Sequence, residues 1–405
     1  MNIPTWALSE ITSYGFVAQK QPQNVEIQEI QEFLERDFRA ITSTQIIPCE
    51  TSSATVRNIH RVKTGEHCII WDERYFQAIE KCLICSLASP SEYKLQNLQA
   101  YLAIAISRSC AERLLYRSPK DAHAVINFFE KLEEENYISK IQIDDVSKCL
   151  SAMKYIRWWT FFHELGHELF HTVPELVSNI EEKVSIAVKL SETLPESNEK
   201  TGSVLIDEAR SHLKEINVIQ SHKTRHKEIL KSLSNSLERE EIWCDVFAVE
   251  QLVLYGFLRK CDPAHMYFAL MINHYINTLI TSTTSYFNSH ITDEKYILGL
   301  NFNKALAMRA DLRALHLNVM LFEIYIKPLN LDIEEFQIRW IGAHYPALSQ
   351  FSEINRGILK TINNFDLRKN IFNEHDIRND NLSQEQKIKT EKNIISYLKW
   401  DVPIL

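Results

Sequence analysis

The chain has 405 residues, of which 45% are hydrophobic, and carries a formal net charge of −8 at neutral pH. This length permits two or three domains, or one large helical body with a sizeable core. The mildly acidic charge excludes a general electrostatic affinity for nucleic acid, so we expect no nucleic-acid partner. Only eight residues are glycine, and this scarcity favours long helices over tight hairpins.

The scattered cysteines favour a protein of a reducing compartment. The apolar stretches of the chain predict no membrane span. The eight cysteines are scattered along the chain, and no basic and apolar leader follows Met1, so we expect no signal peptide. The longest apolar stretches, 100–106 and 242–258, are short or interrupted by charged residues. We therefore expect a cytoplasmic protein with reduced thiols and no contact with a membrane.

The first half of the chain contains the only convincing β region. Apolar residues recur at helical spacing over 25–41 and predict a helix there. Residues 45–71 are rich in β-compatible residues, and Thr64-Gly65-Glu66 is typical of a turn. Further helices are expected over 72–87, 92–116 and 121–135, separated by short stretches of Pro and Ser that end a helix.

The second half is predicted to be helical. The helix expected over 148–171 is apolar nearly all round at 158–162, so we expect it to be central and buried. The segment 175–237 is rich in Glu, Lys, Ser and Asn and is interpreted as a charged helical insertion. Further helices are expected over 238–260, 263–281, 293–325 and 383–400.

The helix 148–171 carries an H-E-x-x-H motif, His163-Glu164-Leu165-Gly166-His167. Residues four apart share one face of a helix, so both imidazoles can meet at one ion. Catalytic zinc takes three protein ligands and keeps a position for water. Glu164 is then the expected catalytic base, which takes a proton from the water and passes it to the leaving amine.

The third ligand must come from another segment. His171 continues the spacing but lies about 12 Å from His163 along a straight helix, too far for one tetrahedral ion. The longer motif with a glycine turn is excluded, because Phe170 and Val173 occupy its glycine and histidine positions.

Glu241 and Asp245 are the best candidates to complete the site. They lie four residues apart on a predicted buried helix, so Glu241 can bind zinc while Asp245 accepts a hydrogen bond from a histidine ligand. Glu238, Glu240 and Glu250 remain alternative ligands. In the simpler alternative, Glu241 and Asp245 form only ordinary ion pairs.

The two segments together resemble a known peptidase family. His163-Glu164-Leu165-Gly166-His167, followed by Glu241-x-x-Cys244-Asp245, is similar to the gluzincin metallopeptidases of the ImmA/IrrE type. It resembles the phage-exclusion Lit-type peptidases more loosely. The resemblance implies a zinc-dependent endopeptidase that cleaves an intracellular protein, in stress response or phage defence. The separation between the two segments is longer than is usual in the ImmA/IrrE type.

These observations predict a mainly α protein of the α+β class with a zincin-like metallopeptidase core, a small β-sheet and extensive helical additions. The expected core is 41–265, with the insertion 175–237, between an N-terminal helical segment 1–40 and a C-terminal helical region 266–405. The expected cofactor is Zn2+ and the expected partner a protein substrate. Two alternatives stay open: a catalytically weak zincin-fold sensor or protein-interaction module, and a helical scaffold without metal.

Three further features carry weaker hypotheses. The C-x-x-C of Cys82 and Cys85 is interpreted as a pair of core cysteines. The position of the insertion 175–237 between the two ligand helices allows it to act as a lid or a sensor. By analogy with the gluzincin plan, residues 68–71 are a candidate edge strand for an extended peptide. Candidate oxyanion donors are His290, His316, His344, Tyr345, Arg309 and Arg313.

Overall fold

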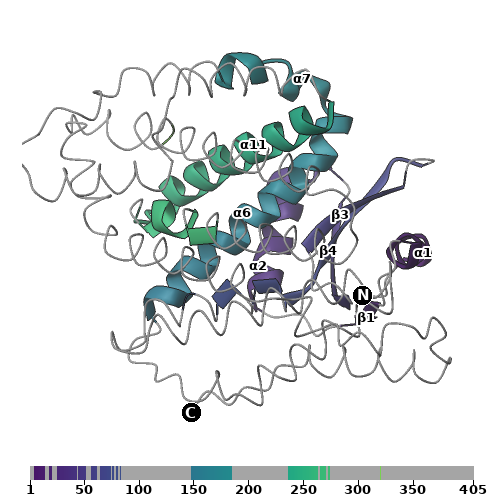
Figure 1. The fold of residues 1–405 in the computed structure, drawn as a ribbon, viewed down its shortest axis with the longest axis horizontal. Helices are drawn as coiled ribbons and strands as arrows, with labels where there is room; N and C mark the ends of the chain where they lie inside the picture. Colours follow the sequence, from purple (N-terminus) through teal and green to yellow (C-terminus); the bar gives the residue numbers. More distant parts are fainter. Residues whose placement is uncertain are drawn as a thin grey trace, which may run out of the picture.

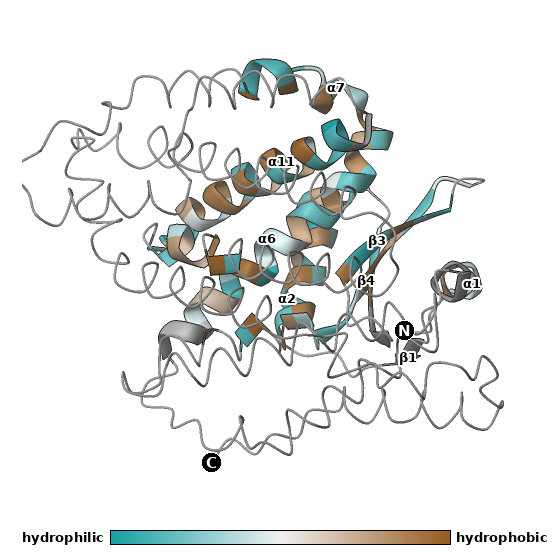
Figure 2. Cartoon of the chain, viewed as in Figure 1, coloured by the Kyte–Doolittle hydropathy of each residue, from teal (hydrophilic) through white to brown (hydrophobic). Residues whose placement is uncertain are grey.

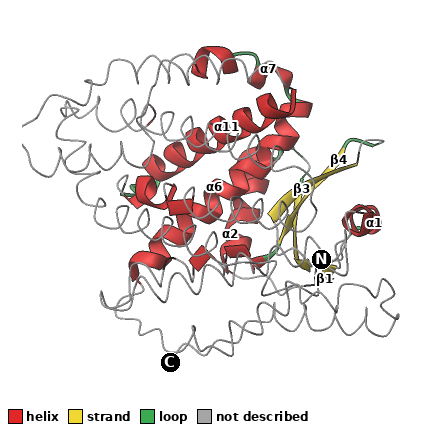
Figure 3. Cartoon of the chain, in the orientation of Figure 1, coloured by secondary structure: helices red, strands yellow, loops and turns green. Residues whose placement is uncertain are grey.

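The computed structural model describes residues 4–13, 18–20, 25–42, 44–51, 56–61, 64–73, 75–76, 79–80, 83, 147–184, 236–262, 265–270, 272–273 and 320. These residues are mostly helical, with one small mixed sheet, as the α+β prediction requires (Figure 3). None of the described helices is long and apolar enough to cross a bilayer.

The sheet forms from the predicted β region and one additional short strand. Its order is β1 (Ala18–Lys20), β2 (Gln45–Thr51), β4 (Glu66–Trp71) and β3 (Val56–Arg61). β2 and β4 are parallel, whereas the other pairs are antiparallel. The predicted turn between β3 and β4 is confirmed, and Gly65 adopts the left-handed φ of 68° there.

Two expectations about this sheet were incomplete or wrong. β1 was not predicted, because three residues are too few to show an alternating pattern. The edge strand proposed at 68–71 was wrong, since β4 lies between β2 and β3 and pairs on both sides. Among the described strands, β3 occupies the edge on that side of the sheet.

Two long helices form the centre of the fold, at the predicted places. α6 (Ser147–Thr172) packs along α11 (Ser236–Leu258), and its other side faces β3 (Figure 1). Both helices carry hydrophobic residues on several faces (Figure 2). The predicted burial of 158–162 is confirmed, since each of these residues is buried.

The N-terminal helices pack at two different places, α1 on the sheet and α2 on the central helices. α1 (Thr5–Ser13) lies against β3; α2 (Val25–Phe33) continues into a π-helical turn, η1 (Leu34–Phe38). The Phe33 ring meets Trp158 edge-on at 5.0 Å between centroids, and Tyr255 stacks on Trp158 at 4.1 Å. An aromatic cluster therefore joins α2, α6 and α11.

A buried arginine on α6, Arg157, forms ion pairs with α2 and with the segment that follows β4. Nη1 of Arg157 lies 2.9 Å from the carboxylate of Glu26, and Nη2 bonds Glu73, which follows β4. The guanidinium also lies over the ring of Phe76, 5.3 Å from its centroid. Burial raises the pKa of Glu26, although Arg157 opposes this shift. Arg157 thus forms ion pairs with two carboxylates where α2, α6 and the segment after β4 meet.

Replacing Arg157 by methionine should destabilise the protein by about 3 kcal/mol, because Glu26 and Glu73 lose their common cation in a partly buried place. Urea denaturation measures this free energy. The matched control is Arg36→Met, which breaks an exposed pair with Asp37 and should cost less than about 1 kcal/mol. Equal losses in both variants would contradict the role of Arg157.

Several predictions lie outside the described residues. These are the helices over 92–116, 121–135, 293–325 and 383–400, the pair Cys82 and Cys85, and all six candidate oxyanion donors. Of the insertion, the structure describes residues up to 184, where α7 (Pro174–Val177) and a short helical stretch follow α6, and residues 236–237, which begin α11. The lid hypothesis and the domain boundaries stay predictions.

Candidate metal centre

The two helices bring the three predicted metal ligands together. Nε2 of His163 lies 3.6 Å from Oε2 of Glu241, and Nε2 of His167 lies 3.9 Å from Oε1 of the same carboxylate. One ligand atom from each residue lies within 4.8 Å of the other two. His163, His167 and Glu241 form the only such group among the described residues, and they could hold one metal ion.

Gly166 allows the two helices to approach closely enough for this arrangement. A Cβ atom at Gly166 would lie 3.2 Å from both Cα and Sγ of Cys244 and 3.3 Å from its Cβ. Cys244 is buried and lies one turn after Glu241 on α11. The close contact inside the motif therefore holds Glu241 near the histidines, which are supplied by α6.

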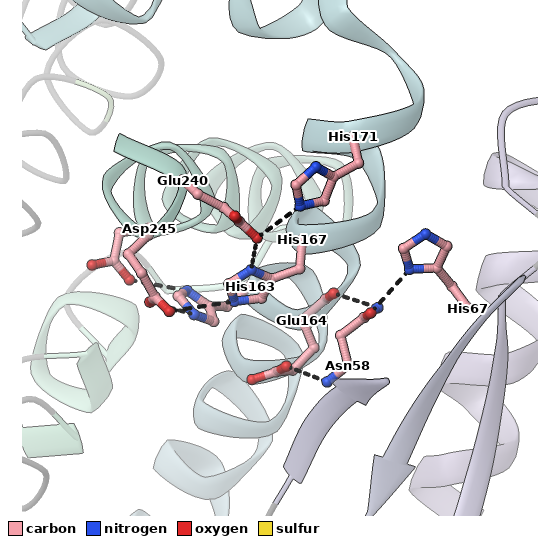
Figure 4. Close-up of polar contacts among 9 residues, drawn as sticks. Asn58, His67, His163, Glu164, His167, His171, Glu240 and Asp245 are labelled. Carbon is pink, nitrogen blue, oxygen red and sulfur yellow. Dashed lines mark hydrogen bonds and ion pairs between the residues drawn. The ribbon is translucent and has the colours of Figure 1, made fainter. Parts of the chain in front are cut away.

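Asp245 supports His163 from the side opposite Glu241. Its Oδ1 lies 3.0 Å from Nδ1 of His163, and its side chain is 2% exposed (Figure 4). Burial lowers the pKa of His163, but the interactions of its ring with the carboxylates of Asp245 and Glu241 outweigh burial and raise that pKa to about 9. Asp245 thus has the position predicted for a carboxylate that orients a histidine ligand.

Glu240 has a position that the sequence analysis did not predict. Its Oε1 lies 2.8 Å from Nδ1 of His167 and 3.2 Å from Nε2 of His171. Hydrogen bonding to His167 is the main cause that lowers the pKa of Glu240. Glu240 therefore orients His167 as Asp245 orients His163. The available sequence signal was its place directly before Glu241.

The remaining candidate ligands lie outside the metal-ligand group. His171, excluded on spacing, is exposed and pairs with Glu240. Glu250, an alternative ligand, lies 2.6 Å from Nζ of Lys183. Glu238 is not part of the group either. The described geometry therefore favours Glu241 over each alternative.

Glu164 points towards the edge strand, as Figure 4 shows. Its carboxylate accepts a hydrogen bond of 2.6 Å from the backbone N–H of Asn58 in β3. The Asn58 side chain donates through Nδ2 to the backbone carbonyl of Glu164, at 3.1 Å. On its other side, Oδ1 of Asn58 lies 3.1 Å from Nδ1 of His67 in β4.

The sequence analysis missed Asn58, His60 and His67. His60 and His67 oppose each other across the β3–β4 hairpin, and their rings stack at 4.1 Å and 6°. His60 also stacks on His171 at 5.9 Å. Pairing the hairpin outward from Gly65 would have placed the two histidines side by side. Nothing in the sequence showed that this face of the hairpin meets α6.

Burial keeps His67 neutral. Burial, followed by the nearby histidines, lowers the pKa of His67 from 6.5 to about 4. The unfolded chain takes up this proton near pH 6.5, whereas the folded chain does so only near pH 4. The stability that neutral His67 contributes is therefore present above pH 6.5 and is lost as the pH falls to 4.

Replacing His67 by glutamine should reduce the loss of stability, measured as the free energy of unfolding, between pH 6.5 and 4. Glutamine can donate to Asn58 but does not titrate, so the variant should lose on the order of 2 kcal/mol less than wild type between pH 6.5 and 4. Urea midpoints across this range measure the difference. The partly exposed His265 provides the control: His265→Gln should keep the wild-type slope. Parallel profiles for wild type and His67→Gln would contradict the prediction.

Comparison with protein-family models, curated proteins and solved structures found no match for this chain. The case for its function therefore depends on the residues of the site and on the resemblance of its two motif segments.

Proposed function

We propose that the protein is a zinc-dependent endopeptidase. The supporting observation is the convergence of His163, His167 and Glu241 from two helices, with Glu164 beside them. Two imidazoles and one carboxylate are a donor set that catalytic zinc uses, with the fourth position left for water or substrate. The zincin-like core is part of this proposal.

Each residue has a separate task in the proposed reaction. His163, His167 and Glu241 would hold zinc, and Asp245 and Glu240 would keep the two imidazoles oriented through their Nδ1 atoms. Bound zinc in such sites lowers the pKa of water towards about 7 and polarises a carbonyl group. Glu164 takes a proton from the attacking water at its carboxylate and delivers it to the nitrogen of the departing amine.

We propose an extended peptide as the substrate class. β3 lies at the edge of the described sheet, and its Asn58 N–H donates to Glu164. An extended chain that pairs with the rest of this edge would pass the proposed base. The described cysteines form no disulfide, and Cys49, Cys68 and Cys244 are buried, which agrees with action in a reducing compartment on an intracellular protein.

The deciding experiment compares new protein N-termini in bacterial cells that express wild type or Glu164→Gln. We expect a defined set of cleavages with wild type that disappears in the variant, while the purified variant keeps about one zinc per chain. The control Glu250→Gln alters a carboxylate on α11 that pairs with Lys183 outside the ligand group, and it should keep the cleavages. A full zinc load without any wild-type cleavage would favour a sensor or interaction module, and the absence of metal would favour a helical scaffold.

A further inference from the structure

The backbone of the edge strand contacts the proposed base directly. The N–H of Asn58 donates to Oε2 of Glu164 at 2.6 Å. In the antiparallel β3–β4 pair, Asn58 lies opposite Ile69. Because the N–H of Asn58 is directed to α6 and not to β4, Asn58 and Ile69 form one of the non-hydrogen-bonded pairs of the ladder. The sheet therefore does not require this N–H, which is free to hold the carboxylate.

The side chain of Asn58 fixes the strand against the helix. Its Nδ2 donates to the backbone carbonyl of Glu164, so the amide is oriented with Oδ1 towards His67. Oδ1 can only accept, and Nδ1 of His67 must then carry the hydrogen of that contact. Two hydrogen bonds thus anchor the backbone N–H of Asn58 beside the carboxylate.

The surrounding rings hold this anchor in place. His67 is buried and stacks face to face on His60, and it keeps the proton on Nδ1 that Asn58 requires. His60 stacks on His171, which pairs with Glu240, the partner of His167. Contacts from β3 and β4 therefore reach the metal site in two ways: Asn58 contacts Glu164 directly, and His60 is connected to His167 through His171 and Glu240.

We infer that Asn58 is a positioning residue: its backbone N–H holds the Glu164 carboxylate in place, and its side chain fixes that N–H against α6. This inference rests on the proposed function for its catalytic meaning. A glutamate side chain has several rotatable bonds, and a proton acceptor must stay within hydrogen-bond reach of its donor. Asn58 restricts the carboxylate to one place before substrate arrives.

The contact is tested first without metal or substrate. In amide nuclear magnetic resonance spectra, the backbone proton of Asn58 should resonate far downfield in wild type and move upfield in Glu164→Gln. Glu168→Gln is the control, because Glu168 lies on α6 one turn further, is buried and has no described contact with Asn58. An Asn58 proton that does not respond to Glu164→Gln overturns the inference, whatever the protein does to peptides.

The positioning effect is tested with Co2+ in the metal site and acetohydroxamic acid as the probe, a small chelator whose hydroxyl interacts with a neighbouring carboxylate. Asn58→Pro removes the outward N–H, and an edge strand tolerates proline where the N–H is not part of the ladder. Its affinity for the probe should fall about tenfold, as in Glu164→Gln, with unchanged Co2+ content. Asn58→Ala keeps the N–H but loses both anchors, and should give a smaller loss.

The outcomes separate this inference from the proposed function. Wild-type probe affinity in a folded Asn58→Pro variant overturns the positioning role even if the protein is a peptidase. If Asn58→Pro does not fold, the spectra of Glu164→Gln decide the contact and Asn58→Ala decides its effect on the probe. A protein that binds no Co2+ refutes the metal site, and a positioning role in catalysis is refuted with it. Once a substrate is known, Asn58→Ala should lower kcat and leave KM nearly unchanged.

Discussion

Glu241→Ala is expected to lower the zinc affinity by two to three orders of magnitude while the protein stays folded. Structural zinc sites contribute about 10–16 kcal/mol through four ligands, so an even share for one ligand is about 2.5–4 kcal/mol. Glu241 is partly exposed and supplies both carboxylate oxygens to the space between the imidazoles. Its removal therefore takes away a ligand without opening the core.

Competition with a chelator of known affinity measures the loss of zinc affinity in Glu241→Ala. Two other carboxylates on the same helix provide control variants with smaller expected losses. Glu240→Gln alters the carboxylate that contacts His167 and His171, and it should cost about 10–100-fold in affinity. Glu250→Gln breaks the pair with Lys183 and should leave the affinity unchanged. Zinc should also raise the melting temperature of wild type but not of Glu241→Ala. An unchanged affinity in Glu241→Ala would show that another residue completes the site.

Gly166→Val is expected to reduce both the stability and the metal affinity. Even a Cβ at this position meets Cα, Cβ and Sγ of Cys244 at 3.2–3.3 Å, and the two methyl groups of valine require still more room. Overpacking of this kind costs about 1–3 kcal/mol, and a backbone atom cannot move away as a flexible side chain can. The displacement of α11 then carries Glu241 away from the histidines, so affinity should fall at least about tenfold.

Two related variants make this prediction specific. Gly166→Ala adds only the Cβ and improves helix propensity by about 1 kcal/mol, so its stability should lie near wild type and its metal affinity slightly below. Adding Cys244→Ala to Gly166→Val removes Sγ but leaves Cα at 3.2 Å, and should restore the affinity only in part. Urea denaturation and chelator competition on the same samples separate the two effects. A Gly166→Val protein with wild-type affinity would show that the helix contact does not position Glu241.

The element boundaries were predictable where a long stretch of the chain is rich in apolar residues. The expected helices 148–171 and 238–260 correspond to α6 and α11 within two residues, and the β region 45–71 contains β2, β3 and β4. The order of the strands was not predictable, because β-compatible residues in neighbouring strands look alike. The hairpin turn at Gly65 indicated that β3 and β4 pair, but not that β2 joins β4 rather than β3.

The candidate site was likewise predictable within one helix but not between elements. Spacing on a single helix predicted which atoms of α6 share a face, since the helix repeat is a local property. The partners of those atoms come from other elements. Glu240 was grouped with possible ligands, whereas the fold places it on Nδ1 of His167. Asn58 reaches Glu164 only because β3 lies at the sheet edge beside α6.

The sequence by itself determined the chemical groups and their local order: two imidazoles one turn apart, a carboxylate between them, and a pair of acidic residues one turn apart on a second helix. Only the tertiary structure decided that the second helix approaches through Gly166 and Cys244, and that each imidazole has its own carboxylate partner. Backbone hydrogen bonding and side-chain periodicity act within a few residues of the chain. The meeting of α6, α11 and β3 depends instead on packing between segments far apart in sequence, which no local pattern records.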